Sequence, residues 1–119
     1  MLKKILITGA AGFIGSRFFH FLKKKNYKIF GVDFGIFKNK DSELYELDLT
    51  NLDKKNKLIN NIKPDFIFHL AAFAGPPRNE IYPDKARKYN VELVKTLLKD
   101  LDKSIPIFFP STDKIFSGL

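Results

Sequence analysis

The segment ITGAAGFIG, residues 7–15, constrains the fold of this chain more than any other stretch. It places Gly9, Gly12 and Gly15 between an apolar run at 3–8 and a helical pattern that starts at residue 13. The first glycine permits a sharp turn out of a strand, the second lets backbone amides approach a pyrophosphate, and the third lets helix and sheet pack closely. The segment therefore predicts a strand, a phosphate-binding turn and a helix, in that order.

Strand-like and helix-like patterns alternate along the rest of the chain. Strands are predicted at 3–8, 28–33, 44–49, 66–72 and 105–110, and helices at 13–25, 50–63 and 83–102. Strands joined by helices of this length require right-handed crossovers, so we expect a parallel sheet covered on both faces. The predicted fold is a doubly wound, Rossmann-type α/β domain of about five strands.

The apolar spacing also predicts which side of each helix is buried. In the second helix, Thr50 and Asp53 resemble a capping box at its start, and Lys63-Pro64-Asp65 ends it. The predicted buried faces are Ile14, Phe18, Phe21 and Leu22 in the first helix, Leu58, Ile59 and Ile62 in the second, and Val91, Val94, Leu98 and Leu101 in the third.

Length and composition exclude several kinds of protein. At 119 residues the chain is long enough for one domain, and without cysteine it has no disulfide, thiolate metal site or cysteine nucleophile. Two histidines, His20 and His69, are too few for a zinc site, so no metal is expected. No apolar run suits a membrane span and no export signal is visible, so we expect a soluble, cytoplasmic protein without a membrane partner.

The net charge of +8 raises the alternative of nucleic-acid binding. Only three of the 21 basic residues are arginine, however, and the lysines are scattered at helix ends and surface positions, including 23–25, 54, 55, 57, 99 and 103. The aromatic residues lie in apolar blocks and do not alternate with basic ones. This distribution favours a lysine-rich solvated surface, and no nucleic-acid partner is expected.

Asp33 ends the second predicted strand, 18 residues after Gly15. A carboxylate at this place can accept hydrogen bonds from the adenosine ribose and repels a 2′-phosphate, which favours NAD over NADP. The nearby Arg17, Lys38 and Lys40 would weaken that repulsion. The alternative is a surface carboxylate that merely ends a strand.

Taken together, these motifs carry a family resemblance. TGAAGFIG resembles the signature of the extended short-chain dehydrogenase/reductases, the NAD-dependent epimerase/dehydratase family. Further matches run through the chain: Asp33, LDLTN with Asp48, HLAA at 69–72, Pro83 and Asn90, and STDKIF at 111–116.

The resemblance implies a role for each matching residue along a bound dinucleotide. Leu70, Ala71 and Ala72 would line the cofactor channel, although HLAA could equally be core strand alone, and His69 is more simply read as a core histidine. The implied contacts are Gly9, Gly12, Phe13, Ile14 and Gly15 with the pyrophosphate, Asp33 with the adenosine ribose, Asp48 and Leu49 with the adenine, and Asn90 with the nicotinamide half.

STDKIF matches the place where the family carries its catalytic serine or threonine, which assigns that role to Thr112. The alternative is that Thr112 ends a strand and caps the next turn. The family's proton-transfer pair, a tyrosine followed four residues later by a lysine, does not occur in these 119 residues. The residues four positions after Tyr27, Tyr45, Tyr82 and Tyr89 are Gly31, Leu49, Ala86 and Leu93.

The resemblance implies a function in which NAD serves to epimerise, dehydrate or reduce a sugar nucleotide, without choosing among these reactions. We expect residues 1–119 to be an incomplete NAD-binding domain, truncated before the later strands and the carboxyl-terminal lobe, so catalysis by this chain alone is uncertain. In the complete enzyme the partner would be a nucleotide sugar, and a homodimer is possible. The alternative is a non-catalytic NAD-binding or regulatory module.

Overall fold

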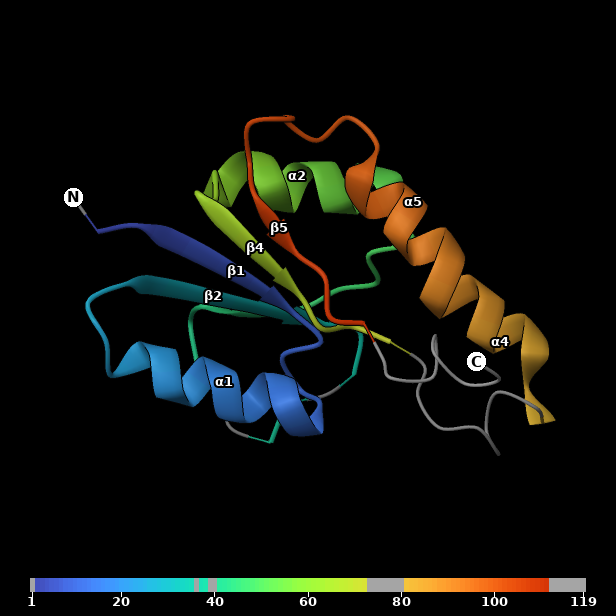
Figure 1. Ribbon diagram of the computed structural model, residues 1–119, viewed down its shortest axis with the longest axis horizontal. Helices are drawn as coiled ribbons and strands as arrows, with labels where there is room; N and C mark the ends of the chain where they lie inside the picture. The colour runs from blue at the N-terminus through green and yellow to red at the C-terminus, as the bar shows by residue number, and fades with distance from the viewer. Residues whose placement is uncertain (1, 36, 39–40, 73–80, 112–119) are drawn as a thin grey trace, which may run out of the picture.

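The computed structural model of the protein describes residues 2–35, 37–38, 41–72 and 81–111. Five parallel strands form one sheet in the order β3-β2-β1-β4-β5, which confirms the predicted doubly wound α/β fold (Figure 1). The strands are β1 (Lys4–Thr8), β2 (Lys28–Asp33), β3 (Leu44–Glu46), β4 (Phe66–His69) and β5 (Ile107–Phe108).

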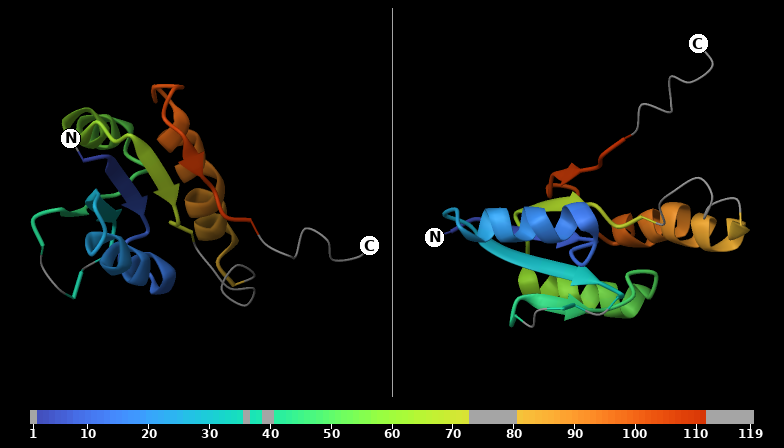
Figure 2. Two further views of the ribbon diagram at one scale, coloured as in Figure 1. Left: turned by 60° about the vertical axis from the view of Figure 1, so that its left-hand side comes forward. Right: turned by 90° about the horizontal axis from the view of Figure 1, so that it is seen from below.

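Helices cover both faces of the sheet, α1 on one side and α2 with α5 on the other (Figure 2). Leu6 and Ile67 point to the α2 and α5 side, whereas Ile5 and Ile7 point to the α1 side, so the central strands are apolar on both faces. The helical segments are α1 (Phe13–Lys23), α2 (Leu52–Ile62), α4 (Pro83–Arg87), the π-helical turn η1 (Lys88–Glu92) and α5 (Leu93–Leu98).

The buried face of α1 differs from the predicted one. Ile14 and Phe21 are 67% and 55% exposed, whereas Phe19 is buried. The cause is Gly15, where an added Cβ would lie only 2.0 Å from the carbonyl oxygen of Gly9. That contact turns the Gly15 side of the helix inward, and the residues three, four and seven positions later follow it: Phe18, Phe19 and Leu22.

The predicted start of α2 is also wrong by one residue. The N-cap is Asn51, whose side-chain oxygen accepts a hydrogen bond from the Lys54 N–H at 3.1 Å. Thr50 lies before the cap, where both its N–H and its hydroxyl donate to Asp48. The predicted end is confirmed, since Lys63 adopts a left-handed conformation with φ of 53° directly after the helix.

Lys55 was expected on the solvated surface, but it is buried. It lies on the inner side of α2, and its ammonium group donates to the carbonyl oxygen of Lys99, just after α5. This oxygen has no partner within the helix, so the lysine acts as a cap from a neighbouring element. Desolvation lowers the pKa of Lys55, and the charge of Asp100 opposes that shift.

The third predicted helix, 83–102, is divided into α4, η1 and α5 and ends at Leu98. A π-helical turn contains more residues than an α-helical turn, so it rotates the side chains that follow it. Leu93 and Leu97 therefore face the core, while the predicted Val91 and Leu98 are exposed. Leu101 does pack against the core, after the helix has ended.

Four strands are shorter than predicted: β1 by one residue, and β3, β4 and β5 by more. After His69 the N–H of Leu70 donates to the backbone oxygen of Thr8 and to its hydroxyl, and β4 ends. β3 ends before the turn at Asp48. β5 begins only after Pro106, because proline has no N–H to donate to a neighbouring strand.

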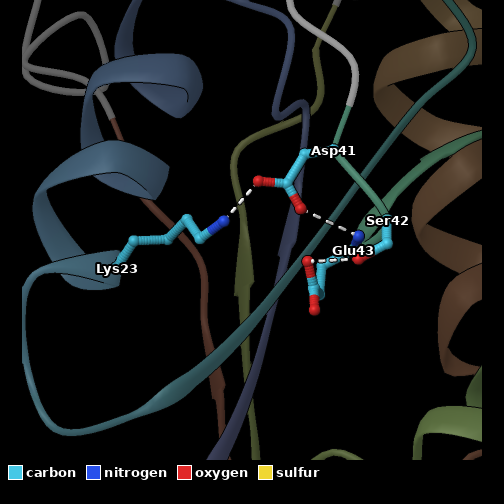
Figure 3. A network of polar contacts seen from close by, with 4 residues as sticks. All are labelled: Lys23, Asp41, Ser42 and Glu43. Carbon is cyan, nitrogen blue, oxygen red and sulfur yellow. Dashed lines mark hydrogen bonds and ion pairs between the residues drawn. The ribbon is translucent and has the colours of Figure 1, made fainter.

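A polar network joins the end of α1 to the segment before β3 (Figure 3). Lys23 in the last turn of α1 forms an ion pair with Asp41, which also accepts a hydrogen bond from the Glu43 N–H at 3.0 Å. Hydrogen bonding from Glu43 and then from Lys23 holds the pKa of Asp41 far below its ordinary value. These contacts attach the edge of the sheet to the helix.

Candidate functional site

The glycine-rich turn lies where the carboxyl end of β1 meets the start of α1. Gly9 has a φ of +69°, and an added Cβ there would lie 2.7 Å from the backbone nitrogen of Ala71. The Gly12 N–H donates to the Gly9 oxygen at 3.0 Å, which closes the turn. Gly9 and Gly15 are thus required by close packing, whereas a Cβ on Gly12 would meet only the Gly9 oxygen, at 3.2 Å.

Asp33 links the end of β2 to this turn. One carboxylate oxygen accepts from the Ala11 N–H at 3.0 Å and the other from the Gly35 N–H at 3.1 Å. In addition, the Ala10 N–H donates to the Val32 oxygen at 3.2 Å. The carboxylate is therefore held beside the backbone that would surround a phosphate group.

A cavity of about 120 Å³ opens between the glycine-rich turn and the carboxyl ends of β2 and β4. Six residues that the sequence assigned to the cofactor line it together: Gly9, Gly12, Asp33, Leu70, Ala71 and Ala72. Phe34, Tyr89 and Leu93 complete the wall, and no sequence motif had indicated these three. Their only signal was position, since Phe34 follows Asp33 and Tyr89 precedes Asn90.

A second cavity, of about 20 Å³, lies beside the first and shares Gly9, Asp33 and Phe34 with it. The predicted adenine contacts Asp48 and Leu49 line this smaller space. One oxygen of Asp48 accepts from the Thr50 N–H at 2.9 Å and from its hydroxyl at 2.7 Å, which fixes the carboxylate at the wall.

Four predicted site residues are not brought into these cavities. Phe13 and Ile14 are exposed, and Arg17 stacks over the Phe13 ring with its guanidinium 3.8 Å from the ring centre. Gly15 is buried beneath the turn, and Asn90 lies half-buried in η1 without lining either cavity. The predicted catalytic residue Thr112 lies outside the described residues.

The hydroxyl of Thr8 organises the backbone on the far side of the cavity. It accepts from the N–H groups of Leu70 at 3.0 Å and Ala71 at 3.2 Å, and lies 2.7 Å from Nδ1 of His69. Because it already accepts twice, we assign its proton to the bond with Nδ1, which leaves the imidazole proton on Nε2. Thr8 thereby holds the two residues that Gly9 packs against.

His69 is a buried residue of the core, as expected. Its Nε2 has no hydrogen-bond partner among the described residues, and its ring stacks on Phe109 at 5.5 Å. Desolvation lowers the pKa of His69 from 6.5 to about 4. The imidazole is therefore neutral near pH 7 and acts here as an acceptor for Thr8.

Within residues 2–35, 37–38, 41–72 and 81–111, no three His, Asp or Glu side chains are placed to hold a metal ion. Over the same residues, no helix is both long enough and apolar enough to cross a membrane.

Comparison with known proteins agrees with this geometry. The chain is 28% identical over 127 residues to UDP-glucose 4-epimerase of Mycoplasma genitalium, an alignment that covers 95% of this chain and 37% of the relative. Among solved structures, L-threonine 3-dehydrogenase from Trypanosoma brucei is 28% identical with a TM-score of 0.86, over 94% of this chain and 37% of that one. dTDP-4-dehydrorhamnose reductase from Bacillus anthracis str. Ames, in complex with NADP, is 26% identical with a TM-score of 0.67, over 82% and 31%.

The chain thus spans about a third of the length of these relatives. The family model for the NAD dependent epimerase/dehydratase family matches residues 5–118. From the glycine-rich turn to the end of the sheet, the chain belongs to the NAD dependent epimerase/dehydratase family.

Proposed function

We propose that this chain is the cofactor-binding part of an NAD-dependent enzyme that epimerises, dehydrates or reduces a sugar nucleotide. The observation that carries the proposal is the cavity at the carboxyl ends of β1, β2 and β4, where six residues assigned to the cofactor from sequence alone meet. In doubly wound sheets, ligands bind at this edge. The sugar-nucleotide substrate is inferred from the names of the epimerase and the reductase to which the chain is similar.

The cofactor is a nicotinamide dinucleotide, and we propose NAD in preference to NADP. The residues present have the right chemistry for the adenosine half of a dinucleotide, because Asp33 is held at the cavity beside the open backbone at Gly12. A carboxylate has about four acceptor positions, and the Ala11 and Gly35 N–H groups use two of them. The remaining positions can accept from the ribose hydroxyls, while the negative charge repels a 2′-phosphate.

Bound NAD would supply the hydride acceptor for a transient oxidation at a sugar carbon. Of the residues that handle the proton, the chain has Thr112, whose hydroxyl we propose hydrogen-bonds the reacting substrate oxygen. The tyrosine and lysine that would complete proton transfer are absent from these 119 residues, so we expect cofactor binding without turnover by this chain alone.

The test is NAD binding by isothermal titration calorimetry with Gly12→Val. The backbone angles of Gly12, φ −74° and ψ 175°, suit any residue, so the variant should fold while its side chain blocks the anion-binding turn. We expect at least tenfold weaker NAD binding, and unchanged binding with Asn61→Val, an exposed position on α2. Equal NAD affinity of folded Gly12→Val and the wild type would refute the proposed site.

Asp33→Ala tests the choice between the two dinucleotides. The substitution removes the negative charge and frees the Ala11 and Gly35 N–H groups to donate to a phosphate. NAD binding should therefore weaken while NADP binding improves. A variant that keeps the wild-type ratio of the two affinities would contradict the preference for NAD.

A second candidate is a non-catalytic NAD-binding or regulatory module. The absence of a lysine four residues after any of the four tyrosines favours it. Such a module would bind NAD as tightly as any longer form of the protein. Oxidation or reduction of the cofactor by the purified chain with a sugar nucleotide would exclude this second candidate.

A further inference from the structure

Two aromatic rings close the cavity where the ribose-binding carboxylate lies. Phe34 and Tyr89 stack with ring centres 5.1 Å apart and an angle of 8° between the ring planes. Phe34 follows Asp33 at the end of β2, and Tyr89 belongs to η1 on the far side of the cavity. The stack therefore bridges the open edge of the site.

Both rings line the cavity of about 120 Å³, and Phe34 also lines the neighbouring space of about 20 Å³ with Asp48 and Leu49. Sites for drug-sized ligands usually occupy about 300–1,000 Å³. The space beside Asp33 is therefore narrow while the two rings remain stacked, and we expect at least one wall of the cavity to move when an adenosine group binds.

The other walls are poorly suited to moving. Gly9 is packed against the backbone of Ala71, which is bonded to Thr8, and Leu49 and Leu93 belong to the core. Phe34, in contrast, is 62% exposed. Tyr89 is half-buried at the margin of the core, and it lies in a π-helical turn, a local irregularity that is frequent at functional sites. The ring pair is therefore the wall that can open.

We propose that the Phe34–Tyr89 stack is a closed gate over the adenosine end of the dinucleotide site, an inference that rests on the proposed function. A purine ring displaces Tyr89 and takes its place on the face of Phe34. One aromatic stack is thus exchanged for another, and adenine nucleotides are favoured over ligands without a flat ring. Because such a stack contributes little free energy, the need to open it lowers the apparent affinity for an adenine nucleotide by only about two- to tenfold.

The gate can be tested by titrating ADP-ribose into the wild-type chain, Tyr89→Ala and Phe34→Ala. Removing Tyr89 opens the gate, so ADP-ribose should bind about two- to tenfold more tightly. Removing Phe34 also removes the platform for the purine, so binding should be several-fold weaker. Tyr27→Ala, an exposed tyrosine beyond the opposite end of the sheet, is the matched control and should bind like the wild type.

Nicotinamide mononucleotide, which lacks the purine, should bind equally to all four proteins. Circular dichroism melts verify folding, and Tyr89→Leu replaces Tyr89→Ala if the alanine variant unfolds. Weaker ADP-ribose binding by the Tyr89 variant would show a fixed wall and overturn the gate. Equal or tighter binding by Phe34→Ala would overturn the platform role.

The same titrations separate the gate from the proposed function. If the wild type binds ADP-ribose and neither variant changes its affinity, the gate is wrong and the cofactor site stands. If neither the wild type nor any variant binds ADP-ribose or NAD, the proposed function is wrong, and the gate is wrong with it.

Discussion

At the scale of single residues, Asp33 and Thr8 show that the side chains around the cavity also hold its backbone in place. The sequence predicted that Asp33 would contact a ribose, and that role stays a prediction. The structure adds that both its oxygens accept backbone N–H groups, one of them in the glycine-rich turn. Thr8 was not predicted at all, because a threonine before the first glycine gives no sign of its partners 61 to 63 residues away.

His69 leads to a prediction on pH dependence. Its pKa is lowered from 6.5 to about 4 by desolvation, so the unfolded chain takes up a proton at a higher pH than the folded one. The contribution to stability is complete above pH 6.5 and is lost as the pH falls to about 4. The loss should be at most about 3–4 kcal/mol, at roughly 1.4 kcal/mol per pKa unit.

Urea unfolding at several pH values checks this prediction. Between pH 6.5 and about 4, the free energy of unfolding of the wild type should fall by more than that of His69→Gln. The reason is that the glutamine at position 69 carries no titratable group. His20→Gln is the control, because it removes an exposed histidine of α1 and leaves the buried one in place. Parallel curves for the wild type and His69→Gln would show that His69 does not titrate on unfolding.

At the scale of elements, the contact of α1 with the glycine-rich turn decides which side of the helix is buried. The spacing of apolar residues predicted that Ile14 and Phe21 would be buried. It gave no weight to Gly15, because glycine has no apolar side chain. In the structure the smallest residue, Gly15, is the one that lies closest to another backbone. A helix that must approach a turn this closely presents its glycine to the turn, and the larger side chains on the same side are then buried.

Gly15→Ala should therefore destabilise the protein although alanine is the better helix former. Its Cβ would lie 2.0 Å from the Gly9 oxygen, so α1 would have to move away from the turn. We expect a loss of about 2 kcal/mol or more in urea unfolding, as for other overpacked sites. The matched control is Gly12→Ala, whose Cβ has 3.2 Å to the same oxygen and should cost far less. Similar losses for the two variants would contradict this explanation.

In the segment of α4, η1 and α5, the sequence predicted a helix but not the side of it that is buried. Its helical character was predicted correctly, but the π-helical turn shifts the buried positions to Leu93 and Leu97. No residue of this segment marked the turn in advance. The same turn carries Tyr89 to the cavity edge.

At the scale of the whole molecule, strand order brings the site together. Gly9, Asp33 and Ala71 are far apart in the sequence, yet β1 lies between β2 and β4, so their carboxyl ends meet. The same order leaves β5 at one edge of the sheet. A row of aromatic rings reaches this edge. The ring centres of Phe18 and Phe68 are 4.8 Å apart, and those of Phe68 and Phe108 are 5.3 Å apart.

We predict that the 119-residue chain self-associates through this edge. Phe108 is 49% exposed on β5, the edge strand of the sheet among the described residues, and such edges and apolar rings commonly pair with another chain. Phe108→Lys should weaken self-association at least tenfold, measured by light scattering over a range of concentrations. Phe21→Lys removes an exposed ring from α1 instead and should have no effect. Equal molar masses for all three proteins would show that the edge is not an interface.

The sequence by itself determined the fold class, the glycine-rich turn and most of the residues around the cavity. These features depend on local sterics and on apolar periodicity, which short stretches of sequence record directly. The tertiary structure alone decided that Lys55 is buried, that Thr8 bonds His69, and that Phe34 stacks on Tyr89. Each of these contacts joins segments distant in the sequence, and its energy depends on distances that exist only after the sheet has assembled.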